Sequence, residues 1–382
     1  MISDYTTVEY EIPGKAFGAP TFLFVIDTCV CEDDELDEIK DSIQQAMGSL
    51  IPEDANVGLI TFGQHVQIYD ISSDVMARSV VLRGDKQYEP SQIQELLGVL
   101  RAGAAAGAAP TQSGPTNNAR RFLGRAGDSE AAMEAALDDV FPDPWPTEQD
   151  CRPNRCLGNA IHVAVSLLEG GLHQSAGRVM LFLSGPTTIG PGKIVEPDLR
   201  YTLRSHTDLA KDNDSAKYHD SSREFFDGIA QRCTSSSLQI DVFACALDQV
   251  GLFEMRECIE NTGGLCVVGD EFKQSIFKES FRRVFTKHED DEAPEGDAGF
   301  MMAGGGAMLE VQTSPDYKVC GAIGHCVSLK KTGPSVSETE IGEGGTYVWA
   351  LSGVHPTTTI ALYFEVNRQE AAPISPDRQR YI

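Results

Sequence analysis

Residues 21–31 read Thr21-Phe22-Leu23-Phe24-Val25-Ile26-Asp27-Thr28-Cys29-Val30-Cys31, a continuous apolar run that ends in an aspartate and two cysteines. A short apolar run without polar breaks predicts a strand that is buried on both faces of a sheet. Similar runs alternate with amphipathic stretches over residues 22–285, and this alternation is typical of strands and helices around a mostly parallel sheet. Ligands of such sheets bind beyond the carboxyl ends of the strands, so Asp27, Cys29 and Cys31 are the first candidates for a site.

The aspartate resembles the first metal ligand of von Willebrand A-type domains, which carry Asp-x-Ser-x-Ser at this point. Cys29 and Cys31 stand where those two serines would be. Mg²⁺ prefers several oxygen ligands in a near-octahedral array, and a neutral thiol is a poor substitute for a hydroxyl. A second apolar run is followed by Ser184-Gly185-Pro186, where a metal-binding A domain usually offers another aspartate. We therefore expect a von Willebrand A-like (Rossmann-like) α/β fold with a degenerate metal site, in which Asp27 braces neighbouring loops.

Apolar periodicity predicts the elements of this α/β unit. Strands are expected at 22–27, 57–62, 178–184, 240–246 and 265–269, and helices at 33–50, 157–169, 223–233, 252–259 and 272–285. Residues 66–71 follow the second strand after a short turn, which predicts an antiparallel hairpin. Residues 98–129 are rich in Ala and Gly without a sustained period and predict a flexible insertion.

The pattern changes near the C-terminus. Residues 289–306 begin with Glu-Asp-Asp-Glu and end with Gly-Gly-Gly, a composition typical of a solvated linker. Beyond it the apolar period becomes two, with strands expected at 308–312, 317–323, 326–329, 346–351 and 358–366. The predicted organisation is therefore an α/β trunk over 1–288, a linker over 289–306 and a partial antiparallel β-sandwich over 307–382, whose strands look too few to close a sandwich.

Composition excludes several classes of function. The chain has 382 residues and a net charge of −26, which disfavours nucleic acid and bare anionic membranes as partners. No apolar run approaches a membrane span and no secretory signal is visible, so we expect a cytosolic protein. The ten cysteines contain no Cys-x-x-Cys pair and fit reduced thiols, so we expect no structural zinc.

No local motif points to catalysis, and we predict no catalytic, cofactor-binding or metal-ligating residues. The Gly-rich run 185–193 lacks the spacing of a phosphate-binding loop and predicts a rigid turn. His162 is expected in the core or on a helix face. Cys29 could be an activated thiol, but a small buried residue is the favoured interpretation because no partner histidine can be named.

Two basic clusters are candidates for contact with an anionic partner. They are Arg120-Arg121 and Arg282-Arg283 with Lys287. A few such charges on an acidic protein usually lie on solvated helices or loops.

Longer runs carry a family resemblance. They are FLFVIDTC at 22–29, VGLITFG at 57–63, DPWP at 143–146, ACALDQ at 244–249, FRRVFTK at 281–287, GAIG and CVSL between 321 and 329, and PTTT and YFEV between 356 and 366. In this order they are similar to the GTPase-activating inner-coat subunit of COPII vesicles, and the Asp-Thr-Cys at Asp27 is itself a trait of that family.

The resemblance implies a coat protein of transport from endoplasmic reticulum to Golgi, peripheral on the cytosolic face of the membrane. The implied partners are the cargo-adaptor subunit, a Sar-type small GTPase and outer-coat subunits. The chain looks truncated at both ends: the family's zinc finger and the half that supplies its GTPase-stimulating arginine are missing. The resemblance thus implies a scaffold with no cofactor and no intrinsic active site. The alternatives are a metal-dependent A domain and a cysteine-based enzyme that uses Cys29 or Cys31.

Overall fold

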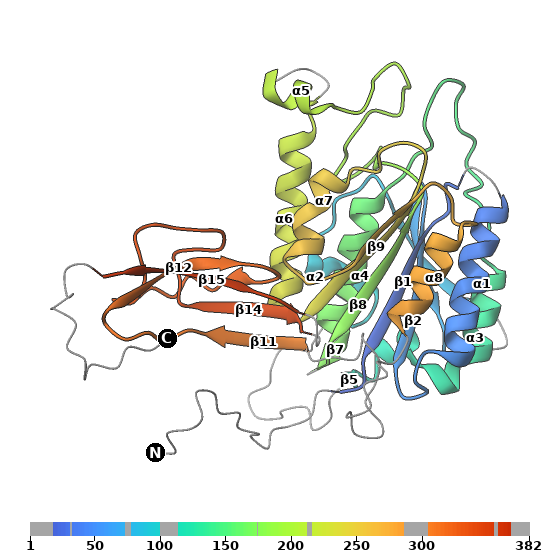
Figure 1. The fold of residues 1–382 in the computed structure, drawn as a ribbon. Coiled ribbons are helices and arrows are strands. Elements are labelled where there is room, and N and C mark those ends of the chain that lie inside the picture. The colour runs from blue at the N-terminus through green and yellow to red at the C-terminus, as the bar shows by residue number, and fades with distance from the viewer. Residues whose placement is uncertain are drawn as a thin grey trace.

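The computed structural model describes residues 18–30, 33–72, 78–99, 114–173, 175–211, 216–285, 305–354 and 358–367. They form a large α/β unit and a smaller antiparallel β module, which projects from one side of the α/β unit (Figure 1). Within these ranges, no helix combines the length and the apolar character needed to span a bilayer.

One sheet organises the α/β unit, with strand order β10-β9-β8-β1-β2-β3-β4. The first five strands in this order run parallel, and β3 and β4 continue the sheet antiparallel. The bounds are β1 Thr21–Asp27, β2 Asn56–Phe62, β3 His65–Asp70, β4 Arg78–Arg83, β8 Gly177–Leu183, β9 Leu238–Cys245 and β10 Cys266–Gly269. Every residue of β1, β2, β8 and β9 is buried, which explains why these strands are predominantly apolar in the sequence.

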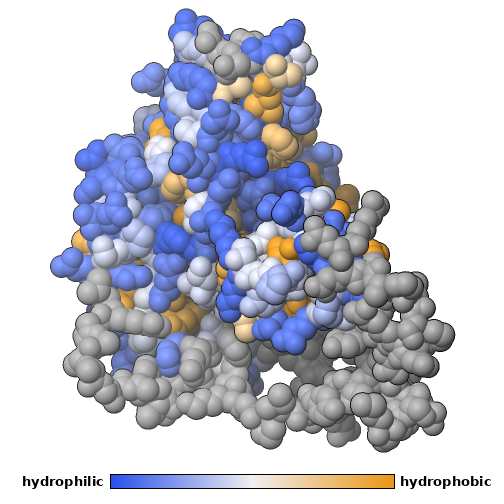
Figure 2. Space-filling model, turned by 90° about the vertical axis from the view of Figure 1, so that its left-hand side faces the viewer, coloured by the Kyte–Doolittle hydropathy of each residue, from blue (hydrophilic) through white to orange (hydrophobic). Residues whose placement is uncertain are grey.

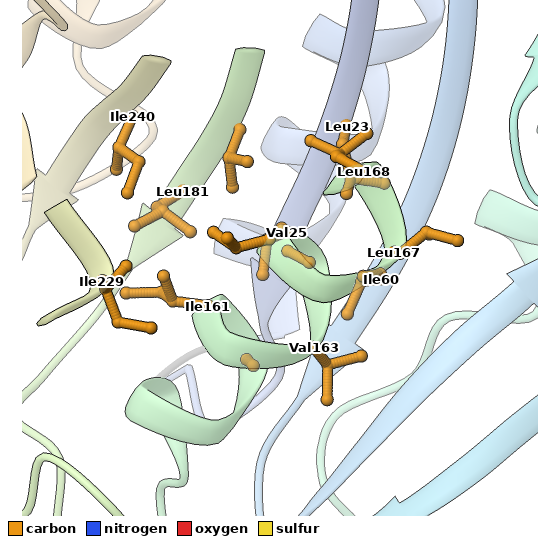
Figure 3. Close-up of a cluster of buried hydrophobic side chains, with 14 of the residues drawn as sticks. Leu23, Val25, Ile60, Ile161, Val163, Leu167, Leu168, Leu181, Ile229 and Ile240 are labelled. Atoms are coloured by element: carbon orange, nitrogen blue, oxygen red, sulfur yellow. The ribbon is translucent and has the colours of Figure 1, made fainter. Parts of the chain in front are cut away.

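Helices cover both faces of the sheet. One face packs against α2 Pro90–Leu96, α4 Leu157–Gly171, α6 His219–Ser235 and α7 Leu252–Glu260. The other packs against α1 Asp33–Ser49, α3 Ala126–Asp138 and α8 Ser275–Val284. Figure 3 shows the first core, in which Leu23 and Val25 of β1 meet Ile161 and Leu168 of α4. Alternate residues of β1 enter the two cores because successive side chains of a strand point to opposite faces.

All five predicted trunk strands and the hairpin at 66–71 are present, and the five predicted helices differ from the observed ones by a few residues at their ends. The flexible insertion predicted at 98–129 is wrong for residues 114–129. That segment contains β5 Gly114–Pro115, η1 Ala119–Arg121, β6 Gly124–Arg125 and the start of α3. Phe122 and Leu123 are buried there, and β6 pairs with β2. Burial of these two side chains orders a stretch whose composition alone suggested a loop, while residues 100–113 lie outside the described ranges.

The β module has two small sheets around a core centred on Trp349, which is fully buried. Its strands are β11 Gly305–Glu310, β12 Tyr317–Ile323, β13 Val327–Ser328, β14 Val348–Gly353 and β15 Ala361–Val366, in the sheets β11-β14-β13 and β12-β15. The predicted linker at 289–306 lies outside the described ranges, except that its last two residues already belong to β11.

The β module contacts the α/β unit at the amino ends of the central strands. Nδ1 of His325 lies 2.8 Å from the backbone oxygen of Glu260, the last residue of α7. Gly353 of β14 lies directly against the side chain of Gln239 in β9, where a Cβ atom would overlap that side chain. Figure 2, which faces the β module, shows a mostly hydrophilic surface with apolar residues in small separate spots.

Two further short elements lie in connections of the described chain. They are the short strand β7 Leu172–His173, which pairs with β5, and the helix α5 His206–Lys211, which lies in the long connection between β8 and β9.

Candidate functional site

The carboxyl edge of the sheet holds a buried ion pair at the position where a metal-binding A domain would hold its cation. Asp27, the last residue of β1, is fully buried, and the Arg155 side chain is only 4% exposed. Nε of Arg155 donates to Oδ2 of Asp27 at 2.6 Å. A guanidinium therefore supplies the positive charge that compensates this carboxylate.

The remaining donors around Asp27 complete its hydrogen bonding. Oδ2 also accepts bonds from the backbone N–H and the hydroxyl of Ser184, at 3.0 and 2.7 Å. Oδ1 accepts a bond from the backbone N–H of Cys29 at 2.9 Å. Asp27 thus ties together the loops after β1 and β8, which is the bracing role that the sequence predicts.

Arg155 reaches this position because two loops hold it. Its Nη2 donates to the Cys29 carbonyl at 2.8 Å, and its backbone N–H donates to the hydroxyl of Thr188 at 2.8 Å. Gly185 is required beside it, since a Cβ there would lie 2.4 Å from Nη1 of Arg155. The Gly-rich run 185–193 therefore forms a turn that leaves room for the Arg155 guanidinium.

The residues present do not fit a divalent cation. The carboxylate that would bind it is engaged by a guanidinium, whose charge repels a second cation at hydrogen-bonding distance. Among the residues that the structure describes, no group of three His, Cys, Asp or Glu side chains could hold a metal ion. The geometry argues against metal-dependent ligand binding at this edge.

The Cys29 thiol is poorly suited to nucleophilic catalysis. Its side chain is buried, and burial is the main cause that raises the pKa of the thiol, with the negative charge of Asp27 as the next cause. Its Sγ lies 3.6 Å from Oδ2 of Asp143, a further carboxylate that disfavours the thiolate. A cysteine enzyme needs the opposite shift, so this alternative is not supported for Cys29, and Cys31 lies outside the described residues.

Asp143 organises the part of this edge that is open to solvent. Its Oδ2 accepts the backbone N–H of Gln64 at 2.6 Å, and its Oδ1 accepts that of Trp145 at 3.2 Å. Gly63 permits this approach, because a Cβ at Gly63 would lie 2.0 Å from the same carboxylate. Trp145 separates two neighbouring hollows of about 490 and 440 Å³. The edge therefore presents an exposed aromatic side chain whose backbone is held by a carboxylate.

His162 of α4 is buried in the core, and its imidazole links α4 to Arg232 of α6 and to the backbone at Tyr88. Nδ1 accepts a bond from Nη1 of Arg232 at 2.8 Å, so Nε2 carries the proton and donates to the Tyr88 carbonyl at 2.9 Å. Burial, and then the charge of Arg232, lowers the pKa of His162 to about 4. This histidine is neutral and structural, as the sequence predicts.

The predicted basic clusters do not converge. Arg121 pairs with Asp70 at 2.7 Å, and Arg282 pairs with Glu279 at 3.1 Å on the exposed side of α8. Arg120 and Arg283 are exposed, while Lys287 lies outside the described residues. Sequence reasoning missed Arg155 and Asp143 as organisers of the carboxyl edge. Their partners lie more than a hundred positions away, at Asp27 and Cys29, so no local pattern could identify them.

Comparison with known proteins shows which family has this architecture. The model of the Sec23/Sec24 trunk domain matches residues 18–285, and that of the Sec23/Sec24 beta-sandwich domain matches residues 304–382. The chain belongs to the Sec23/Sec24 family. The family resemblance in the sequence is thereby confirmed, as is the assignment to the vesicle-coat proteins with a von Willebrand A-like trunk.

One solved structure of this family has a similar fold, and two others show weaker similarity. The human COPII-coat protein Sec24c is 14% identical, with a TM-score of 0.55, and the match covers 92% of this chain and 40% of that one. This chain therefore spans less than half of the length of Sec24c. The VWA domain of SpRpn10 is 11% identical with a TM-score of 0.36, covering 69% and 93% of the two chains. Proximal thread matrix protein 1 of the mussel byssus is 9% identical with a TM-score of 0.37, covering 70% and 48%.

Proposed function

We propose that this chain is a COPII inner-coat component of the GTPase-activating branch, and that its trunk acts as a metal-independent protein-binding scaffold. The observation that carries the proposal is the Arg155–Asp27 pair at the carboxyl edge. In a metal-dependent A domain a bound cation completes its coordination with a ligand carboxylate. Here the guanidinium is internal and almost fully buried, so partner binding depends on surface complementarity.

The proposed partners are the cargo-adaptor subunit and a Sar-type small GTPase, with outer-coat subunits as further contacts. Support comes from the family match over both domains and from the exposed aromatic surface at Trp145. Exposed aromatic side chains are enriched among the residues that dominate binding energy at protein interfaces. The net charge of −26 favours association with the cytosolic face of the endoplasmic reticulum through partner proteins rather than directly.

We further propose that the chain itself has no active site and contains no cofactor. The GTPase-activating branch is named for its stimulation of GTP hydrolysis. We assign that role to no arginine of this chain. Arg282 is engaged with Glu279, and Arg155 is too deeply buried to reach a partner. An arginine finger accelerates GTP hydrolysis by about 10³ to 10⁵. Strong acceleration in a single-turnover assay with the small GTPase would therefore contradict this part of the proposal.

Analytical ultracentrifugation of the purified chain with the trunk of the cargo-adaptor subunit tests the scaffold role. We expect a one-to-one complex whose stability is unchanged by EDTA, because no cation takes part in the contact. The same run with a Trp145→Ala variant asks whether the aromatic surface contributes. A complex that dissociates in EDTA would favour the metal-dependent alternative, and no complex from folded protein would refute the scaffold role.

A further inference from the structure

The β3–β4 hairpin carries an apolar hollow beside the free edge of the sheet. Val81 of β4 lines it together with the rings of Phe141 and Trp145, and these side chains are 57%, 66% and 53% exposed. His65 and Gln67 of β3 form part of its floor. Large apolar side chains exposed together on a soluble protein mark interaction surfaces.

Trp145 is held in its exposed position by the protein itself. Its backbone N–H is bonded to Asp143, and its ring lies 5.6 Å from the ring of His65. Proline at 144 and at 146 restricts the backbone on both sides. An anchor that is already ordered loses little conformational entropy when a partner binds.

The edge of β4 has unpaired backbone groups next to this hollow. The N–H of Arg83 donates to the Tyr88 hydroxyl at 3.2 Å, and its carbonyl accepts from Nδ2 of Asn159 at 2.9 Å, so both groups point away from β3. Backbone groups alternate along a strand, and those of Ser79 and Val81 therefore point outward as well. Within the described residues, the outward groups of Ser79 and Val81 have no hydrogen-bond partner.

We propose that β4 accepts an extended segment of another protein, which adds a strand at Ser79 and Val81 and places an apolar side chain in the hollow. In such strand addition the main chain supplies affinity and the pocket supplies selectivity. The charge of the strand indicates the chemistry of the segment. β4 begins and ends with arginine and contains no acidic residue, although the whole chain carries −26. Arg83 is paired with Asp85, which leaves Arg78 to attract an acidic segment.

A second copy of the chain is a poorer occupant of this edge. Pairing two β4 strands would bring the Arg78 residues of both copies to one pair of strands, neither of which contains an acidic residue. Like charges on neighbouring strands are destabilising, and arginine or lysine on an edge strand is a common protection against self-association. The partner is therefore a different protein with carboxylates in its strand.

Hydrogen exchange on the full chain tests the proposal with a defined probe. The probe is a heptapeptide in which glutamate alternates with valine and leucine, and the control peptide has lysine in place of glutamate. At about 1 mM glutamate peptide we expect exchange of the Ser79 and Val81 amides to slow by about tenfold. Trp145 emission should change in the same titration, because the other tryptophan, Trp349, is fully buried. The lysine peptide should have little effect on either signal.

Three variants separate strand addition from a simple apolar contact. Val81→Pro removes the outward N–H, and proline is tolerated on an edge strand where that N–H faces solvent, so it should abolish binding with the fold retained. Val81→Thr keeps the N–H and the branched shape, and should retain amide protection at reduced affinity. Trp145→Ala removes one wall of the hollow and should weaken binding without any change to the edge.

Four results would overturn the proposal. Slow exchange at Ser79 and Val81 in the free chain would show that the edge is already paired. No slowing at about 1 mM peptide would show that it accepts no strand. Equal slowing by the lysine peptide, or unchanged binding by Val81→Pro, would refute the acidic preference or the strand geometry. Each of these results leaves coat membership, and the complex expected in the ultracentrifuge, unaffected.

Discussion

Replacement of Arg155 by methionine is expected to destabilise the α/β unit by about 3–5 kcal/mol, because it leaves a buried carboxylate without its counter-charge. Asp27 is fully buried and accepts a 2.6 Å bond from the guanidinium, so solvent cannot substitute for the missing partner. Methionine keeps much of the apolar stem of arginine. The loss of stability should therefore reflect charge and hydrogen bonding more than a cavity.

A double-mutant cycle with Asp27→Asn isolates the pair from its surroundings. Asparagine keeps one of the two oxygens, so it can accept from Ser184 or from Cys29 but not from both, and it leaves the buried Arg155 guanidinium without a counter-charge. Each single variant thus leaves one buried charge without its counter-charge, and the double variant leaves none. We expect a coupling energy of about 2 kcal/mol or more, with the double variant more stable than the sum of the single losses predicts.

Urea unfolding at neutral pH measures these losses. The Trp349→Phe background leaves Trp145 as the single tryptophan, so that fluorescence reports the α/β unit rather than the β module. Since about 1 kcal/mol shifts the melting temperature of a domain of this size by about 2–4 °C, Arg155→Met should lower it by about 6–20 °C. Arg200→Met is the matched control: Arg200 pairs with Asp198 but is 83% exposed, so solvent screens the pair and its loss should change the stability little.

Two results would refute this reasoning. If Arg155→Met costs no more than Arg200→Met, the buried pair contributes nothing beyond a surface contact. If the losses of the two single variants simply add, the residues do not act as a pair, and the replacement of a cation by Arg155 has no energetic basis.

Three further predictions concern protonation, thiol reactivity and metal. The pKa of His162 is lowered to about 4 from an ordinary value near 6.5, so between these pH values the unfolded chain binds more protons than the folded chain. The free energy of unfolding should therefore fall as the pH drops from about 6.5 to 4, by up to about 1.4 kcal/mol per pH unit. His162→Gln, which can keep both hydrogen bonds without titrating, should lose less stability over that window in urea unfolding. Iodoacetamide at neutral pH should label the exposed Cys266 of the native protein and leave Cys29 unmodified, as measured by peptide mass spectrometry. Rapid labelling of Cys29 would contradict its buried, protonated state. Calorimetric titration with Mg²⁺ should detect no binding at Asp27, because Arg155 already neutralises that carboxylate. A binding heat that the unmodified chain shows and the Asp27→Ala variant lacks would contradict this prediction.

The sequence predicted the buried framework well because burial leaves a strong local signal. β1, β2, β8 and β9 are buried along their whole length, and each is predominantly apolar, with Arg178 of β8 and Asp241 of β9 buried as an ion pair. Elements with mixed burial were missed. β4 has a single buried residue, Leu82, and α3 is rich in alanine, so neither shows a clear apolar period.

The carboxyl edge was only half predictable. Substitution of cysteine for serine after Asp27 indicated that the metal site is damaged, and local chemistry was enough for that inference. What compensates the aspartate was not predictable. Arg155 lies 128 positions away in the sequence and reaches Asp27 only because the start of α4 and the 185–193 turn fold against the end of β1. Contacts of this kind depend on the tertiary fold and have no periodic signature.

A guanidinium and a divalent cation make different demands on the surface above them. A metal ion in an A-type site stays reachable, because an incoming carboxylate must complete its coordination, and the loops around it respond to that ligand. Arg155 is enclosed, and its donors are directed to Asp27, the Cys29 carbonyl and the Ser184 hydroxyl. These described residues are therefore bonded to one another before any partner arrives, which suits a coat subunit that must present the same surface in every copy. In our proposal, recognition then falls to groups farther out, such as Trp145 and the edge of β4, where variation in sequence could change partners without disturbing the core.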